Sequence, residues 1–155
     1  MPVIRTAISI GLSMDRVFEF VTTPSNSPKW CHSSWKMVTD HPLQPGERVI
    51  EDLSVAGRHV CIEWTVRESQ PPRLWVIVGK TEDGGTATMT YTLTAEPNGT
   101  RFKRELLYNI RALFDEQGGF LSLRNRLQAD LAESLRRLKR ILEDSMAAYR
   151  GAGVR

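Results

Sequence analysis

The feature that most constrains the fold is a long segment near the C-terminus that lacks helix-breaking residues. From Ser122 to Met146 the chain contains neither proline nor glycine. Apolar side chains recur there at steps of three or four residues, at Leu127, Leu131, Leu135, Leu138, Leu142 and Met146. This spacing predicts an α-helix with one apolar stripe, about 35–40 Å long at about 1.5 Å per residue. Because the stripe must be covered, the helix is expected to pack on a sheet formed by the preceding residues.

The middle of the chain has the pattern of an antiparallel sheet. Between Thr86 and Ala95, threonines alternate strictly with apolar residues, which is typical of a strand with two different faces. Asn98-Gly99 predicts a tight hairpin, with a returning strand over 101–111. Further strands are predicted at 2–10, 36–41, 47–55, 58–68 and 74–80. Since no long helix separates them, the strands are expected to be antiparallel.

Two short helices are predicted after the first strand. Ser13 is a suitable N-cap, and Asp15 suits the positive end of the helix dipole. Pro24 ends this helix, and Pro28 lies in a second helix or turn that leads toward Trp35. The predicted class is therefore α+β, with a curved antiparallel sheet of six to seven strands wrapped around a long C-terminal helix, which the Ser122 cap would begin.

Length and charge favour one ordinary globular domain. The 155 residues, 41% of them hydrophobic, predict a single domain over 1–150 and a flexible tail over 151–155. The formal net charge is +3, and the densest basic cluster is Arg136, Arg137, Lys139 and Arg140. Acidic residues on the same helix predict the pairs Glu133–Arg137 and Arg140–Asp144 on a solvated face. A nucleic-acid partner is not expected, because no basic and aromatic surface motif accompanies the charge.

The cysteines, Cys31 and Cys61, indicate a reducing compartment. The chain shows no leader and no transmembrane run, so a cytoplasmic protein without stable membrane insertion is expected. Cys31-His32 and the His59/Cys61 pair lack the spacing of a known metal site. The sequence therefore predicts neither a metal nor a cofactor.

Several short motifs, in order, resemble one known family. They are the segment Ser13 to Val21 with Pro24, Pro28 and Trp30, then Pro45-Gly46-Glu47-Arg48, Glu63-Trp64-Thr65-Val66, Pro71-Pro72-Arg73-Leu74 and Gly99-Thr100-Arg101-Phe102. Together they resemble the START-like superfamily, which has the helix-grip fold, and its polyketide cyclase/dehydrase and lipid-transport branch. The resemblance covers nearly the whole chain. It implies a deep, mostly apolar cavity between sheet and helix that holds a lipid, polyketide or other hydrophobic molecule. Because the superfamily has no universal catalytic motif, it assigns no catalytic residue here.

A set of aromatic, apolar and polar residues on the expected inner faces is predicted to contact the ligand. Arg104 shares its strand parity with Phe102 and Leu106, so it is expected among apolar neighbours. Trp75 is expected on the outer face of the sheet, because Leu74 and the apolar residues on the same side of that strand compete for the inner face. The predicted ligand-binding residues are Trp30, Trp35, Trp64, Met89, Tyr91, Arg104, Leu106, Tyr108, Phe114, Phe120, Leu127, Leu131 and Leu135.

Three functions remain open from the sequence. The first is binding or carriage of a small hydrophobic molecule. The second is a cyclase or dehydratase in the same cavity, using Arg104, Tyr91 or Tyr108 as polar groups, with His59 a weaker candidate. The third is a homodimer formed through the threonine-rich face of Thr86 to Thr94.

The segment before the long helix is a candidate gate. Gly118 and Gly119 form an adjacent pair suited to a hinge, and Phe114 or Phe120 could plug the cavity mouth. The alternative is that the two glycines only turn the chain before the helix.

Overall fold

The computed structural model describes residues 2–36, 38–114 and 120–153, and the side chains of all of these except 120–122 and 146–153. The elements in chain order are β1 Val3–Ile10, α1 Met14–Thr22, η1 Pro24–Asn26, α2 Ser27–Trp30, β2 Ser34–Lys36, β3 Arg48–Val55, β4 Arg58–Gln70, β5 Leu74–Lys80, β6 Thr86–Glu96, β7 Gly99–Asn109, η2 Arg111–Leu113 and α3 Phe120–Gly153. The predicted α+β class is confirmed.

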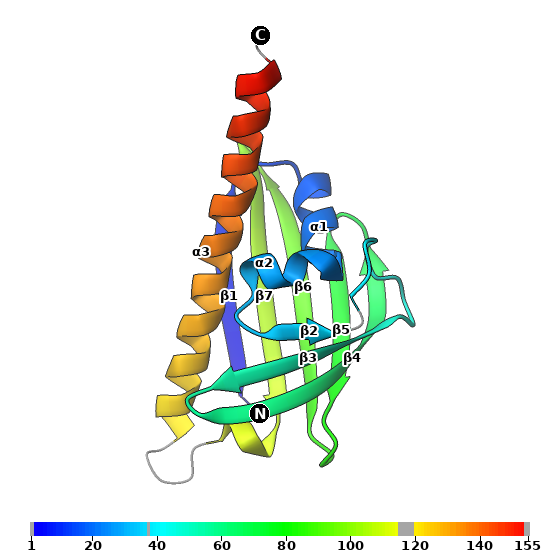
Figure 1. The fold of residues 1–155 in the computed structure, drawn as a ribbon, viewed down its shortest axis with the longest axis vertical. Helices are drawn as coiled ribbons and strands as arrows, with labels where there is room; N and C mark the ends of the chain where they lie inside the picture. The colour runs from blue at the N-terminus through cyan, green and yellow to red at the C-terminus, as the bar shows by residue number, and fades with distance from the viewer. Residues whose placement is uncertain (1, 37, 115–119, 154–155) are drawn as a thin grey trace.

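The strands form one antiparallel sheet of seven strands, in the order β1-β7-β6-β5-β4-β3-β2. Figure 1 shows α3 running beside β1, while β3 and β4 bend across in front of the other strands. Pairing slips by one residue between Val66 and Glu68 in β4, and such bulges increase local twist. The sheet therefore curls around an interior that α3, α1 and α2 close.

Local chemistry accounts for the start of α1 and its packing. The Ser13 side chain accepts a hydrogen bond from the Arg16 amide at 3.3 Å, which confirms the predicted cap. Val17, Phe18 and Val21 are buried against the sheet side of the helix. Thr100 holds the preceding loop, since its buried hydroxyl donates to the Leu12 carbonyl at 2.7 Å.

Helix α3 buries the predicted stripe but begins earlier than predicted. Leu127, Leu135 and Leu138 are at most 2% exposed, and Leu131 is half-buried. The helix starts at Phe120, so a cap at Ser122 was a wrong prediction. It continues to Gly153, and residues 151–153 of the predicted tail are thus helical. The candidate hinge at Gly118 and Gly119 lies outside the described residues.

The strand predicted at 36–41 is wrong, because only Ser34–Lys36 forms β2. The segment after β2 makes its backbone hydrogen bonds elsewhere. The Ser25 amide donates to the Thr39 carbonyl at 3.0 Å, and the Leu43 amide donates to the Thr22 carbonyl at 3.0 Å. These bonds hold the chain against the end of α1 and η1, away from the edge of the sheet.

Trp75 lies on the inner face of the sheet, which corrects the predicted outer position. Its register partner is Tyr91, and the two ring centroids are 5.0 Å apart. The Trp75 indole N–H donates to the Leu43 carbonyl at 3.3 Å. Leu74 and Val76 occupy the opposite parity of β5. Both faces of this strand carry apolar residues, so its own pattern did not distinguish inside from outside.

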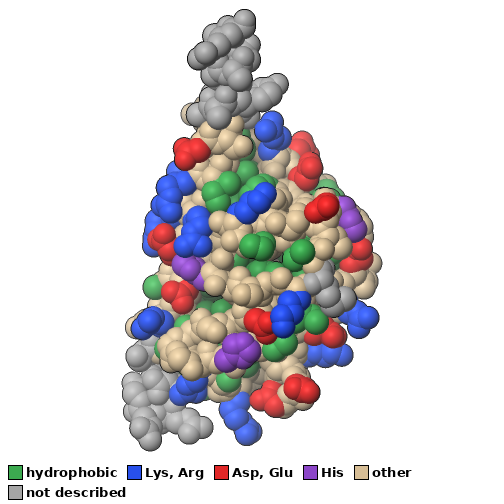
Figure 2. All heavy atoms as spheres, viewed as in Figure 1, with side chains coloured by type: hydrophobic (Ala, Val, Ile, Leu, Met, Phe, Trp, Pro, Cys, Tyr) green, Lys and Arg blue, Asp and Glu red, His purple; other side chains and the backbone are tan. Residues whose placement is uncertain are grey.

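Ion pairs on α3 differ from the two predicted ones. Glu133 pairs with Arg136 at 2.8 Å rather than with Arg137, and Arg140 also lies 3.8 Å from Glu133 rather than pairing with Asp144. Lys139 contacts Glu143 at 2.8 Å, and its ammonium also donates to the Ser9 carbonyl at 2.7 Å. Basic and acidic side chains are interspersed on the face shown in Figure 2.

Candidate functional site

A small chamber lies between the sheet and α3. It is lined by residues from the α2–β2 link, from β2, β3, β5, β6 and β7, and from α3. These residues are Cys31, His32, Ser33, Trp35, Glu51, Leu53, Ile77, Met89, Tyr91, Arg104, Leu127, Asp130, Leu131 and Ser134. Its place in the fold is the one that the sequence predicted for a ligand cavity.

The structure brings six of the predicted binding residues to this chamber: Trp35, Met89, Tyr91, Arg104, Leu127 and Leu131. Six others are placed in the surrounding core without lining it: Trp30, Trp64, Leu106, Tyr108, Phe114 and Leu135. The side chain of Phe120 lies outside the described part of the chain. That these residues bind a ligand stays a prediction.

Arg104 is the polar centre of the chamber. It is 3% exposed and points inward from β7, as its parity predicted. One terminal nitrogen, Nη2, donates to the Leu131 carbonyl of α3 at 2.7 Å. The guanidinium carbon lies 5.1 Å from the centroid of the Trp30 ring, within cation–π range. The Arg104 Nε–H has no acceptor among the described residues, which leaves a buried donor unsatisfied.

Glu51 faces the same chamber from β3. Its Oε1 accepts a hydrogen bond from the Trp64 indole N–H at 2.9 Å, and its Oε2 accepts one from the Ser33 hydroxyl. Burial raises the pKa of Glu51, although the two hydrogen bonds and the charge of Arg104 act in the opposite direction. The chamber therefore contains a carboxylate whose ionised form is disfavoured by its surroundings.

Glu51 was absent from the predicted site, although the sequence carried a signal for it. Val49, Leu53 and Val55 share its strand parity, so Glu51 interrupts the apolar inner face of β3. The same argument, a charged residue among inward apolar neighbours, had identified Arg104 on β7. Ser33 carried no comparable signal, because its role depends on how the α2–β2 link folds over β3.

Two further groups at the chamber are held in their protonated forms. Burial raises the pKa of the Cys31 thiol to about 12, and it raises the pKa of the Tyr91 phenol as well. Neither side chain is therefore a ready nucleophile or base at neutral pH. Each can still exchange hydrogen bonds with a ligand oxygen.

The chamber is small and opens between two segments. Its volume is about 30 Å³, which is room for one or two water molecules. His32 is exposed, and Trp35 and Leu131 are half-buried, so the open side lies between the α2–β2 link and α3. The deep cavity implied by the family resemblance is thus nearly closed by side chains in this structure.

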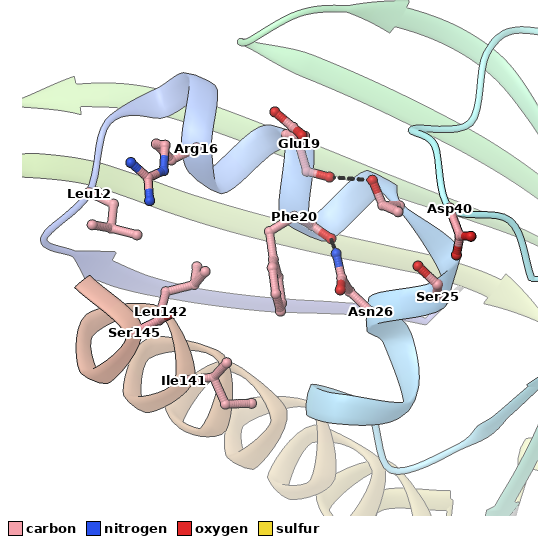
Figure 3. Close-up of a pocket in the computed structure, with 11 residues that line it drawn as sticks. Leu12, Arg16, Glu19, Phe20, Ser25, Asn26, Asp40, Ile141, Leu142 and Ser145 are labelled. Carbon is pink, nitrogen blue, oxygen red and sulfur yellow. Dashed lines mark hydrogen bonds between the residues drawn. The ribbon is translucent and has the colours of Figure 1, made fainter. Parts of the chain in front are cut away.

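A larger hollow lies on the surface between α1 and the C-terminal half of α3 (Figure 3). This groove has a volume of about 350 Å³. Phe20 of α1 points toward Ile141 of α3 across it, with Arg16, Glu19 and Asp40 near its rim. None of the buried unsatisfied side-chain atoms of the described residues belongs to the groove lining. Of the chamber and the groove, the chamber is therefore the better candidate site, despite its size.

The other predicted features lie elsewhere. The threonine-rich face of β6 is on the outside of the sheet, where Thr90 and Thr92 line a hollow of about 620 Å³. That this face joins a second copy stays a prediction. His59 is exposed on the outer face, 3.8 Å from Asp52, and does not line the chamber.

Within the described ranges, no group of three or more candidate side chains could hold a metal ion. In that same part of the chain, every helix is too short or too polar to cross a membrane.

The chamber offers a fixed cation, a protonated phenol and a carboxylate with a raised pKa. Such groups can hold a carbonyl or carboxylate oxygen and can stabilise negative charge in a dry site. Of the groups predicted for an enzyme, Arg104 and Tyr91 line the chamber, whereas Tyr108 does not. A catalytic role for these residues stays a prediction.

Known proteins of other organisms share this fold. A sequence model of a family described as polyketide cyclase/dehydrase and lipid transport matches residues 1–143. No curated protein sequence matches the chain. Protein CV1439 of Chromobacterium violaceum has a TM-score of 0.70 at 17% identity, covering 91% of this chain and 96% of that one. Protein MLL2253 of Mesorhizobium loti has a TM-score of 0.66 at 14% identity, with coverages of 92% and 98%.

A third similar structure comes from a biosynthetic locus. DynU16, described as a protein in the dynemicin biosynthetic locus, has a TM-score of 0.66 at 19% identity. The match covers 91% of this chain but 47% of DynU16. At these identities the likenesses show a shared fold.

Proposed function

This chain belongs to the polyketide cyclase/dehydrase and lipid transport family, and on that premise we propose that it binds a small, largely hydrophobic molecule between the sheet and α3. The observation that carries the proposal is the Arg104 Nε–H, a buried donor at the lining of the chamber that has no acceptor within the described part of the chain. Interior donors are nearly always satisfied, so an unpaired one at a cavity favours a ligand or a trapped water.

Apolar side chains complete the proposed site. Leu53, Ile77 and Met89 line the chamber from the sheet, and Leu127 and Leu131 line it from α3. These groups would cover the hydrocarbon part of a ligand whose oxygen meets Arg104. Burial of apolar ligand surface contributes roughly 25 cal/mol per Å².

A ligand larger than two water molecules must displace part of the wall. The α2–β2 link is the segment best placed to move, because β2 has three residues and, in the part of the chain that the structure describes, pairs with β3 alone at the sheet edge. Trp35 of β2 and Leu131 of α3 line the chamber, and both are half-buried. Entry between these two side chains would leave the paired sheet intact.

A matched pair of variants on α3 tests the location. Leu131→Trp fills the chamber, whereas Ile141→Trp adds the same ring to the groove between α1 and α3. Binding of Nile red, an uncharged dye, is followed by fluorescence titration. We expect Leu131→Trp to weaken binding about tenfold or more and Ile141→Trp to change it by less than about twofold.

Circular dichroism and thermal melting of both variants serve as controls for folding. The opposite pattern, in which only Ile141→Trp weakens dye binding, would assign the ligand to the groove and refute the proposal. Equal affinity in all three proteins would also refute it.

A further inference from the structure

We propose that the ligand is a carboxylate with an apolar tail, and that Arg104 binds its carboxylate group. This inference rests on the proposed function and adds the chemical class of the ligand. It follows from the buried Arg104 guanidinium, which has an unsatisfied N–H and no direct ion pair among the described residues.

Arg104 is a buried cation whose guanidinium has no carboxylate in direct contact among the described residues, although its charge acts on the nearby Glu51. No ion pair joins it to any carboxylate of the described residues. Glu51 lies at the same chamber, but Ser33 and Trp64 donate to its two oxygens. A buried charge is costly unless it is paired, and contact with the Trp30 ring compensates only part of that cost. An anionic oxygen of a ligand would supply the direct partner that the guanidinium lacks.

The donors around the chamber suit a flat head group with two oxygens. The guanidinium is planar and matches a carboxylate through parallel N–H bonds. Tyr91 is the register partner of Arg104 on the neighbouring strand, and both line the chamber. Its phenol can donate a hydrogen bond to an oxygen held by Arg104.

Charge and size together favour a carboxylate over a phosphate. Glu51 and Asp130 both line the chamber, so a doubly charged phosphate monoester would meet two acidic side chains and one arginine. A carboxylate brings only one negative charge toward the same two side chains, so it is repelled less than the phosphate. The chamber volume of about 30 Å³ also favours a three-atom planar group over a tetrahedral one.

The test compares decanoate with 1-decanol, which has the same chain length but no charge. Displacement of Nile red gives both affinities for the wild-type protein and for two variants. Arg104→Met removes the buried cation, and Lys103→Met removes an exposed cation one residue away on the same strand. We expect wild type and Lys103→Met to prefer decanoate about tenfold or more, and Arg104→Met to lose the preference while still binding 1-decanol.

Thermal melting shows whether Arg104→Met folds, and Arg104→Gln is the alternative neutral variant if it does not. Equal binding of decanoate and 1-decanol by wild type would overturn the carboxylate assignment while leaving the proposed function intact. Tighter binding of decyl phosphate than of decanoate would overturn it as well. If Leu131→Trp binds Nile red as tightly as wild type does, in contrast, the proposed function itself is refuted.

Discussion

Replacing Trp64 by alanine is expected to lower the free energy of unfolding by about 3–5 kcal/mol. The side chain is 1% exposed and lies on the inner face of β4. Its neighbour across the strand pair is Gly79, where an added Cβ would lie 2.8 Å from the Trp64 ring. Since this space is shaped around the indole, truncation leaves a cavity. Thermal unfolding should show a decrease in Tm of about 6–20 °C.

Trp64→Phe separates packing from hydrogen bonding. It keeps most of the ring volume but removes the N–H donor to Glu51, whose ionised form this bond stabilises. The bond therefore contributes stability above the pKa of Glu51, and the contribution is lost as the pH falls through that pKa. The Tm difference between wild type and Trp64→Phe should be larger at about pH 8 than at about pH 4. A difference that does not change with pH would contradict the role assigned to this bond.

Replacing Gly99 by alanine is expected to cost about 3 kcal/mol or more. A Cβ at this position would lie 2.1 Å from the carbonyl oxygen of Ile10 and 2.9 Å from the Cα of Gly11. Both contacts are with backbone, so no side-chain rotation relieves them. The pairing of β1 with the start of β7 would have to shift, together with the buried bond from Thr100 to Leu12.

Gly84→Ala is the matched control for Gly99→Ala. Gly84 also turns the chain, with a φ of +89°, but a Cβ there meets nothing within 4 Å. Its cost should be confined to backbone strain, about 1 kcal/mol. Equal melting temperatures for the two variants would show that the close approach at Gly99 does not limit stability.

The parts of the fold with strong periodicity could be predicted from the sequence. The alternation in β6 and the leucine stripe of α3 each bury one face, and each matches the structure. The prediction of a strand at 36–41 was wrong because hydrogen bonds to other parts of the chain, such as the one from the Ser25 amide to the Thr39 carbonyl, hold that segment away from the sheet. The predicted position of Trp75 was wrong because β5 is apolar on both sides, and its pairing with β6 decides which side faces inward.

The position of the site could be predicted better than its size or the full set of residues that line it. Parity alone placed Arg104 and Tyr91 at the interior, and the same reasoning applied to β3 would have found Glu51. The size of the chamber could not be predicted, because it depends on how Trp35, Leu53 and Leu131 pack together across three elements. The pairing of Ser33 with Glu51 depends likewise on the path of a loop.

Nuclear magnetic resonance of the side-chain N–H groups tests the central claim most directly. The indole of Trp35 and the Nε–H of Arg104 belong to the chamber, whereas the indole of Trp75 donates to Leu43 and does not line it. The ¹⁵N-labelled protein is titrated with decanoate and, separately, with 1-decanol. We predict that at least one of these compounds shifts the Trp35 and Arg104 signals while the Trp75 signal changes little. Shifts confined to backbone amides of the groove, around Phe20 and Ile141, would contradict a ligand site between the sheet and α3.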